Sequence, residues 1–234
     1  KYLKKYYWWF EYAGVLFLSN HYSIAEGFYK KSLDLDSDQN VPIIHFLIGD
    51  TLFFQGKFVS AKKQYGKFLK MSPTSNDEEA HLKIVVCENF INENLNDVEF
   101  NRKKSGIFAE EGYKKRDIKK LIKAINAFPL NGLAWFNLGV YLGDAGNRED
   151  AFTAFLTTAI IQDWDREAWK NCFFLSIKLE KMEYMISIYT VLLDKFGIEF
   201  VNYLSEHILK NSNRSREEGL KVIDLLSKIA EEIQ

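Results

Sequence analysis

The sequence predicts an all-α fold, an α-α superhelix of about five to six stacked antiparallel helix pairs, and three observations support it. Trp135 and Trp169 lie 34 residues apart and open similar segments, a period typical of stacked helix pairs. The three prolines, at positions 42, 73 and 129, fall between expected helices, where a fixed φ and a missing N–H do least harm. No segment alternates apolar and polar residues as a half-buried strand does. We therefore expect residues 1–234 to form a single solenoid domain, because one pair alone cannot bury its apolar face.

The first two pairs are expected over residues 5–37 and 41–73. The packing stripe of the first pair starts at Trp9 and continues through Ala13, Leu16, Ala25 and Tyr29. In the second pair His45 takes the place of the tryptophan, and the stripe continues through Ile48, Gly49, Leu52, Ala61, Tyr65 and Phe68. Both stripes have the spacing of one helix face.

The third pair, residues 77–128, breaks this rhythm. Apolar residues indicate one helix from about Asp77 to Asn92 and another from about Gly112 to Phe128. The segment between them is polar, and it delays the next repeat by roughly 22 residues relative to the usual period. We interpret it as an insertion near 94–112, and as the place for an extra helix and for a hinge.

The last three pairs are expected over residues 132–164, 166–197 and 199–231. The first of them carries Trp135, Leu138, Gly139 and Leu142 on one face, and then Ala151 and Phe155. Glycine at position 139 removes a side chain from the contact face, so the partner helix can come close. The other two pairs are less regular; their stripes contain Trp169, Cys172, Met185, Tyr189 and Leu192, and then Tyr203, Gly219, Ile223 and Leu226.

These patterns resemble the tetratricopeptide-repeat family over nearly the whole chain. The family signature is Trp-x₂-Leu-Gly-x₂-Tyr, followed by Ala-x₃-Phe and a final Pro. The pair at 132–164 departs from it only at Leu142 and at the final Pro, and the pair at 41–73 is the second strongest match. The resemblance implies a concave groove, lined by a second stripe on each first helix, in which extended or helical peptides dock.

The positions of this sequence that correspond to the groove stripe hold many aromatic side chains. These side chains indicate an apolar or amphipathic peptide as the ligand. The charged members of the stripe are expected to set the register of that peptide. The alternative interpretation is that curvature or neighbouring helices bury the aromatic rings. The expected groove residues are Phe10, Phe17, Phe46, Asp50, Phe53, Phe54, Phe136, Val140, Asp144, Lys170, Phe174 and Lys178.

One subclass of the family binds C-terminal carboxylates through a Lys and an Asn on this stripe. Here the corresponding places hold Phe136 and Val140 in one repeat, and Phe46 and Asp50 in another. Lys170 is followed by a phenylalanine at the second place. We therefore do not expect this carboxylate clamp.

Composition excludes several classes of partner. The chain is 47% hydrophobic and 27% charged, with a formal net charge of −1. A protein that binds nucleic acid without sequence preference, or an anionic membrane, needs a basic excess that this chain lacks. No apolar run reaches the length of a membrane span, and the nearest, from Tyr6 to Ser19, is interrupted by Glu11. We expect neither a nucleic-acid partner nor a membrane span.

Residues that could carry chemistry are scattered. The four histidines lie far apart, without the spacing of metal ligands, and no phosphate-binding loop or nucleophile motif is present in the sequence. Cys87 and Cys172 each lie in an apolar helical pattern, which favours two buried thiols, although one bridge between them stays open. We expect no enzyme activity, no metal and no cofactor.

The leading hypothesis is a protein-interaction module that binds a peptide or protein segment in the aromatic groove. A second is a repeat domain appended to a larger enzyme, such as a glycosyltransferase. A third is a scaffold that self-associates as a homodimer through the aromatic cluster at Tyr6, Tyr7, Trp8 and Trp9. The sequence leaves the partner's identity open, and also the compartment, with the cytoplasm favoured.

Overall fold

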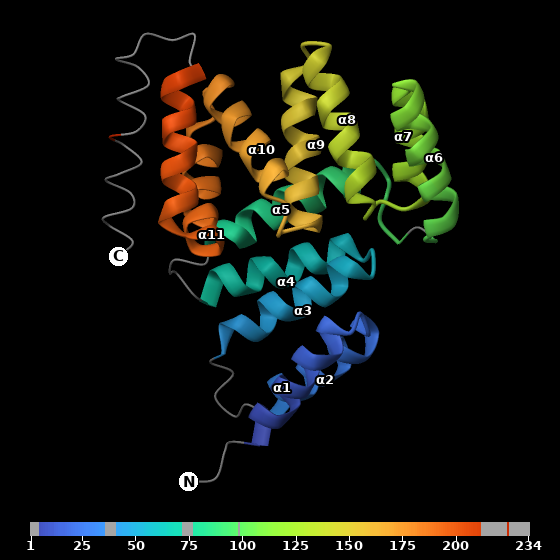
Figure 1. Ribbon diagram of the computed structural model, residues 1–234. Coiled ribbons are helices and arrows are strands. Elements are labelled where there is room, and N and C mark those ends of the chain that lie inside the picture. The colour runs from blue at the N-terminus through green and yellow to red at the C-terminus, as the bar shows by residue number, and fades with distance from the viewer. Residues whose placement is uncertain (1–4, 36–40, 72–76, 98, 212–223, 225–234) are drawn as a thin grey trace. The chain divides into compact units, whose positions relative to one another are not determined.

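The chain forms helices and turns throughout its described part. The computed structural model describes residues 5–35, 41–71, 77–97, 99–211 and 224. These residues contain eleven helices and no strand, so the predicted all-α fold is confirmed (Figure 1). The chain divides into two compact units, which we describe separately: Lys1–Phe108 with Lys123–Asn131, and Ala109–Ile122 with Gly132–Gln234. No helix in the described ranges is long and apolar enough to cross a membrane.

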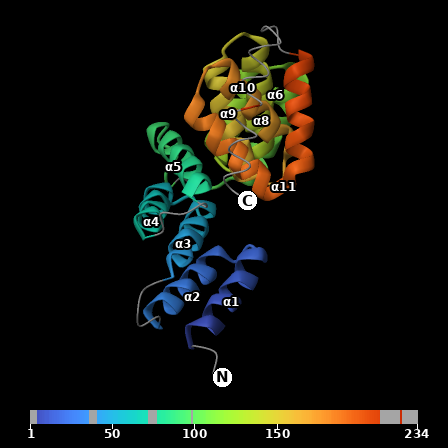
Figure 2. The ribbon, with the colours of Figure 1, turned by 90° about the vertical axis from the view of Figure 1, so that its left-hand side faces the viewer.

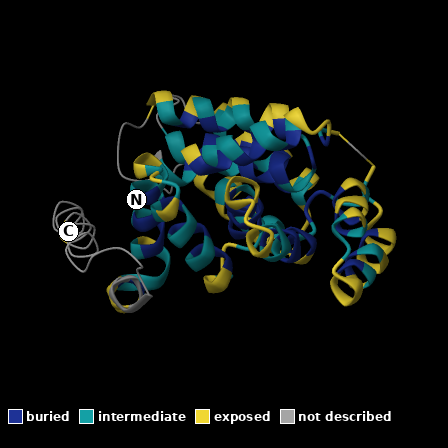
Figure 3. Cartoon of the chain, turned by 90° about the horizontal axis from the view of Figure 1, so that it is seen from above, coloured by how far each residue is buried: buried dark blue, intermediate teal, exposed yellow. Residues whose placement is uncertain are grey.

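The first unit is built on five consecutive helices, each packed against the next (Figure 2). Helices α1 and α2 form one antiparallel pair, α3 and α4 form the second, and α5 packs on α4. The bounds are α1 Lys5–Leu18, α2 Tyr22–Leu35, α3 Pro42–Phe54, α4 Phe58–Met71 and α5 Asp77–Asn92. Most helices of the described part carry buried residues on one face and exposed residues on another (Figure 3).

Glycines allow the closest contacts within pairs, as the sequence predicted for Gly139. A Cβ on Gly139 of α8 would lie 3.1 Å from the ring of Phe155 on α9. At the same place in the second pair, a Cβ on Gly49 would lie 2.5 Å from the ring of Tyr65. Real Cβ atoms rarely approach a neighbour so closely, so each aromatic ring fills the space that its glycine leaves.

The irregular segment forms two helices, α6 Arg102–Lys115 and α7 Ile118–Ala127. The helix expected from Gly112 to Phe128 is therefore interrupted, and much of the polar insertion is helical. The break lies at Arg116, whose φ of 49° is left-handed. Asp117 follows it, and its side chain accepts a hydrogen bond of 3.2 Å from the backbone N–H of Lys120. Such a bond is typical of an N-cap, so Asp117 starts a new helix where the apolar pattern alone runs on.

The second unit contains two further pairs, and again each helix packs on the next. The bounds are α8 Gly132–Asp144, α9 Arg148–Ile161, α10 Arg166–Lys178 and α11 Met182–Asn211. Gly197 interrupts α11 with φ 76° and ψ 172°, a conformation that only glycine adopts readily. The sixth expected pair would begin beyond this glycine; Gly219, Ile223 and Leu226 of its second helix lie outside the described residues.

Candidate functional site

A cavity of about 440 Å³ lies between α8, α9 and α10, all in the second unit. It is bounded by the first helix of one pair, the second helix of the same pair and the first helix of the next. Its lining residues are Gly139, Val140, Gly143 and Asp144 of α8, Arg148 and Phe155 of α9, and Asn171, Phe174, Leu175 and Lys178 of α10.

Helical spacing explains why these side chains converge. Asn171, Phe174, Leu175 and Lys178 follow the i, i+3, i+4, i+7 pattern, which places them on one face of α10. On α8, Gly139 and Gly143 lie one turn apart and line the cavity with backbone only, and the Phe155 ring fills the space beside Gly139. The ring of Phe155, which is buried, closes the cavity from α9.

The start of α10 is fixed by a side-chain cap. Asp165 is the N-cap residue, and its Oδ1 accepts hydrogen bonds from the backbone N–H groups of Glu167 at 3.0 Å and Ala168 at 3.1 Å. Such a cap satisfies backbone donors that have no partner within the helix. It therefore holds the first turn of the helix that contributes four of the cavity's side chains.

Two cations of the cavity stay unpaired among the residues that the structure describes. The side chains of Arg148 and Lys178 make no ion pair or hydrogen bond there, and both are exposed. Two carboxylates near Arg148 in sequence form ion pairs with other cations. Asp144 pairs with Arg116, and Glu149 pairs with Lys181 at 2.9 Å. The cavity therefore presents positive charge beside an apolar wall.

The structure brings four of the expected groove residues together in this cavity: Val140, Asp144, Phe174 and Lys178. The two others in the same unit lie outside it. Phe136 packs on Phe155, with ring centroids 5.5 Å apart. The ammonium of Lys170 pairs with Glu167 at 2.5 Å on the same helix.

In the first unit the expected groove aromatics pack within and between their own pairs. Phe10 contacts the ring of Tyr29 on α2, with centroids 5.9 Å apart. Phe17 and Phe54 lie 5.8 Å apart, across the junction of the first two pairs. Phe46 packs on Phe68 of α4 at 5.3 Å. These four expected residues are half-buried.

Asp50 and Phe53 are buried in the first unit. The carboxylate of Asp50 accepts hydrogen bonds from the Tyr65 hydroxyl at 2.7 Å and from Lys83 Nζ at 2.6 Å. Lys83 also pairs with Glu79 at 3.1 Å. Burial acts to lower the pKa of Lys83, but the two carboxylates outweigh it and raise that pKa, so the ammonium stays charged. Because neither Asp50 nor Phe53 is accessible, we leave both out of the proposed binding surface.

Sequence reasoning missed four lining side chains: Arg148, Asn171, Leu175 and Phe155, which was assigned to the packing stripe. The groove was sought only on first helices, whereas Arg148 opens a second helix. Asn171 and Leu175 share a face with Phe174, and extending the helical spacing from that residue finds both. Within the described residues, no three His, Cys, Asp or Glu side chains gather as a metal site requires.

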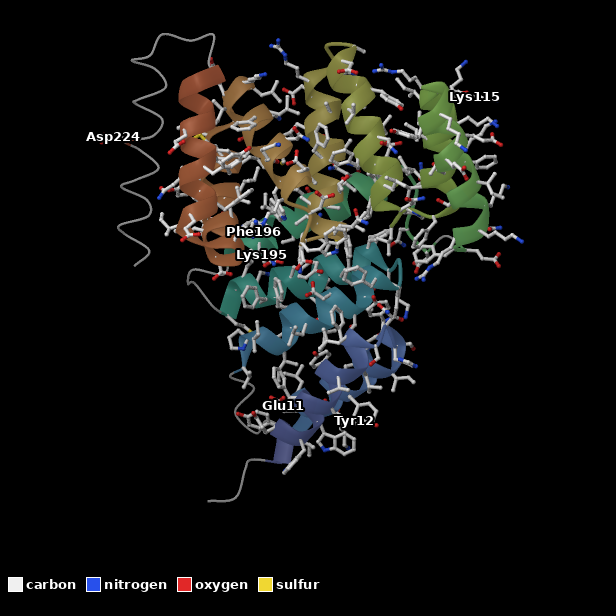
Figure 4. The ribbon with its side chains drawn as sticks, viewed as in Figure 1. Glu11, Tyr12, Lys115, Lys195, Phe196 and Asp224 are labelled. Atoms are coloured by element: carbon white, nitrogen blue, oxygen red, sulfur yellow. The ribbon has the colours of Figure 1, made fainter. Side chains whose placement is uncertain are left out.

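A second feature is a face of α1 that carries exposed Trp8 at 65%, Tyr12 at 55% and Val15 at 59%. Figure 4 labels Tyr12 on this helix. In the register that aligns Trp9 with His45, the equivalent residues of α3 are Ile44, Ile48 and Thr51, each at most 1% exposed. Helix α3 is buried between α2 and α4, whereas α1 packs mainly on α2. Within the described ranges, no helix covers the face of α1 that continues the stack.

Comparison with known proteins gives matches among solved structures only. No family model matches the sequence, and no curated protein matches it. The structure of TTC0263, a thermophilic TPR protein of Thermus thermophilus, is 12% identical, with 87% of this chain and 99% of that chain covered and a TM-score of 0.37. YrrB, described as a TPR protein with an unusual peptide-binding site, is 16% identical, with 85% and 90% covered and a TM-score of 0.33.

The TPR2AB domain of yeast Sti1, in a complex with pHSP90, is 12% identical, with 87% of this chain and 84% of that chain covered and a TM-score of 0.37. These three matched structures carry the name of the repeat that the sequence pattern indicated. The predicted fold class is confirmed by the helix pairs of the chain itself and by their glycine–aromatic contacts.

Proposed function

We propose that the chain is a protein-interaction module that binds a peptide segment in the cavity between α8, α9 and α10. The observation that carries this proposal is the cavity itself, which lies at the junction of two consecutive pairs and contains four residues expected there from the sequence. Concave sites with an apolar wall and a few polar groups are the usual binding sites of proteins. Val140, Phe174 and Leu175 are half-buried, so an apolar side chain of the peptide would displace water from them.

The test is fluorescence polarisation with pools of labelled peptides that contain leucine and phenylalanine at random positions. We expect saturable binding to the purified chain, and about tenfold weaker binding by a Phe174→Ala variant, because an anchor contact is lost. Trp164→Ala is the matched control, since Trp164 is an exposed aromatic residue of the same unit that does not line the cavity. Equal binding by the wild type and the Phe174 variant would contradict the proposal.

A second candidate function is self-association through α1, with a second copy of the chain as the occupant. The exposed stripe is apolar, and the matching stripe of α3 is covered by the neighbouring pair, so α1 of a second copy would cover this stripe in place of a preceding pair. A twofold dimer brings identical surfaces together, and apolar surfaces complement themselves in this way. Helix α1 would therefore be the dimer interface.

Sedimentation at increasing protein concentration tests this candidate. We expect a monomer–dimer equilibrium that Tyr12→Lys shifts to monomer, because a charge would be buried in the interface. Ile24→Lys, at an exposed position of α2, is the control and leaves the equilibrium unchanged. A chain that stays monomeric at every concentration would exclude self-association.

A further inference from the structure

We infer that the peptide bound between α8, α9 and α10 is acidic, with a carboxylate placed beside an apolar side chain. This inference rests on the proposed function, and it adds the chemical class of the ligand. Arg148 and Lys178 carry it, since both line the cavity and neither has a partner among the residues that the structure describes.

The surroundings show which charges of the second unit are already paired. Lys170 pairs with Glu167, Lys181 with Glu149, Lys195 with Asp163 and Arg116 with Asp144. Asp150, the second carboxylate after Arg148, accepts a hydrogen bond from the side chain of Asn147 at 2.5 Å. Neither of the two carboxylates that follow Arg148 forms an ion pair with it.

The two cations come from different pairs. Arg148 opens α9, which is the second helix of one pair, and Lys178 ends α10, which is the first helix of the next. A carboxylate bound by both would bridge the junction between pairs. Guanidinium and ammonium groups bind carboxylates by charge-assisted hydrogen bonds, which are stronger than neutral ones.

The other lining residues of the cavity indicate which peptide residues would accompany the carboxylate. Val140, Phe174 and Leu175 offer an apolar surface next to the cations. Asn171, also half-buried and without a side-chain partner in the described part, carries both a donor and an acceptor for a peptide backbone. The site thus suits an extended segment in which an acidic residue is close to an aliphatic or aromatic one.

This arrangement differs from the carboxylate clamp that the sequence argued against. The places of the clamp hold Phe136 and Val140, and neither of the two cavity cations occupies them. Here the positive charge comes from the start of a second helix and from the end of a first helix. A side-chain carboxylate within a peptide can reach such a site, so a free C-terminus is not required.

The experiment compares three labelled peptide pools that share leucine and phenylalanine but carry Asp and Glu, Asn and Gln, or Lys and Arg. We expect the acidic pool to bind at least about fivefold more tightly than the neutral pool, and the basic pool to bind most weakly. Rising salt should weaken binding of the acidic pool selectively, because ionic contacts at an exposed site are screened.

The variant Arg148→Gln/Lys178→Gln should reduce binding of the acidic pool to the level of the neutral pool and leave the neutral pool unchanged. The control is Lys63→Gln/Lys67→Gln, which removes the same charge from α4 in the other unit. Equal affinity of the acidic and neutral pools, or no effect of the double variant, would overturn the inference while leaving the proposed function intact. Failure of every pool to bind would instead overturn the proposed function.

A single-stranded oligonucleotide serves as a second anionic probe. We expect the acidic peptide pool to bind more tightly than the oligonucleotide, since Phe174 is the one half-buried aromatic ring of the wall on which a base could stack. Tighter binding of the oligonucleotide than of the acidic pool, lost in the same double variant, would overturn the assignment of a peptide.

Discussion

Gly49 is the position at which the two helices of the second pair come closest, because the Tyr65 ring occupies the space that a side chain would need. We expect Gly49→Ala to lower the free energy of unfolding by about 1–3 kcal/mol, since the new methyl forces the ring or the helices apart. Denaturant titration followed by circular dichroism measures the change.

Gly66 of α4 provides the control for this substitution. A Cβ there meets nothing within 4 Å, so Gly66→Ala should stabilise the chain by about 0.4–1 kcal/mol through reduced freedom of the unfolded state. If both substitutions change the stability equally, close packing at Gly49 is not what sets the distance between the helices.

A substitution at Lys83 is also expected to change the free energy of unfolding strongly. Its ammonium lies 2.6 Å from Asp50 and 4.3 Å from the centre of the Phe46 ring, and its side chain is buried. Lys83→Met should lower the free energy of unfolding by about 3–5 kcal/mol, because the buried Asp50 carboxylate is left without its cation.

A double-mutant cycle separates that penalty from the loss of packing. We expect Asp50→Asn combined with Lys83→Met to cost clearly less than the sum of the two single changes, since no unpaired charge then remains. Additive effects in denaturant titrations would mean that the pair contributes no coupling energy.

At the scale of elements, the start of α10 depends on Asp165. Asp165→Ala removes the acceptor for two backbone N–H groups and should lower the free energy of unfolding by about 1 kcal/mol. Asn147, at the N-cap position of α9, makes no cap hydrogen bond and is the matched control; Asn147→Ala should have a smaller effect. Equal losses at the two positions would show that the cap does not stabilise α10.

Helices and their pairing followed from the sequence because the spacing of Trp135, Gly139 and Phe155 reports directly on helix packing. The break at Arg116 did not, since the apolar pattern runs through it and only the cap at Asp117 reveals the new start. Periodicity also could not separate the groove from the interior. Asp50 and Phe53 have the spacing of a groove stripe, yet contacts of α3 with neighbouring helices bury them.

The lining of the cavity between α8, α9 and α10 was also predictable only in part. Four of its side chains followed from the stripe on first helices, including Val140 and Phe174. Arg148 belongs to a second helix, and its proposed role in binding depends on which carboxylates are already paired. Pairing between side chains distant in sequence is a property of the folded chain, and no local pattern encodes it.

At the scale of the whole molecule, the two cysteines allow the opening of each unit to be measured separately. Cys87 lies in the first unit and Cys172 in the second, and both are buried free thiols. Burial raises the pKa of each thiol well above its usual value, so the reactive thiolate is scarce while the chain is folded. We expect both thiols to react with iodoacetamide only after local opening.

Mass spectrometry of digested, labelled protein gives the rate at each cysteine. Stacked repeats interact mainly with their neighbours, so the two rates should differ at intermediate denaturant concentrations. The acidic peptide pool should slow labelling of Cys172, next to Asn171 of the cavity, more than that of Cys87. Identical rates, and identical protection by the peptides, would show that the chain opens as one cooperative body.

The cavity between α8, α9 and α10 also bears on how such a chain can evolve. Because its wall is shared by two consecutive pairs, the site belongs to a junction and not to a single repeat. Gene duplication of one pair adds a junction of the same geometry without disturbing the earlier one. The new junction can then acquire different charges at the positions of Arg148 and Lys178, so a chain of this kind gains a new specificity by lengthening.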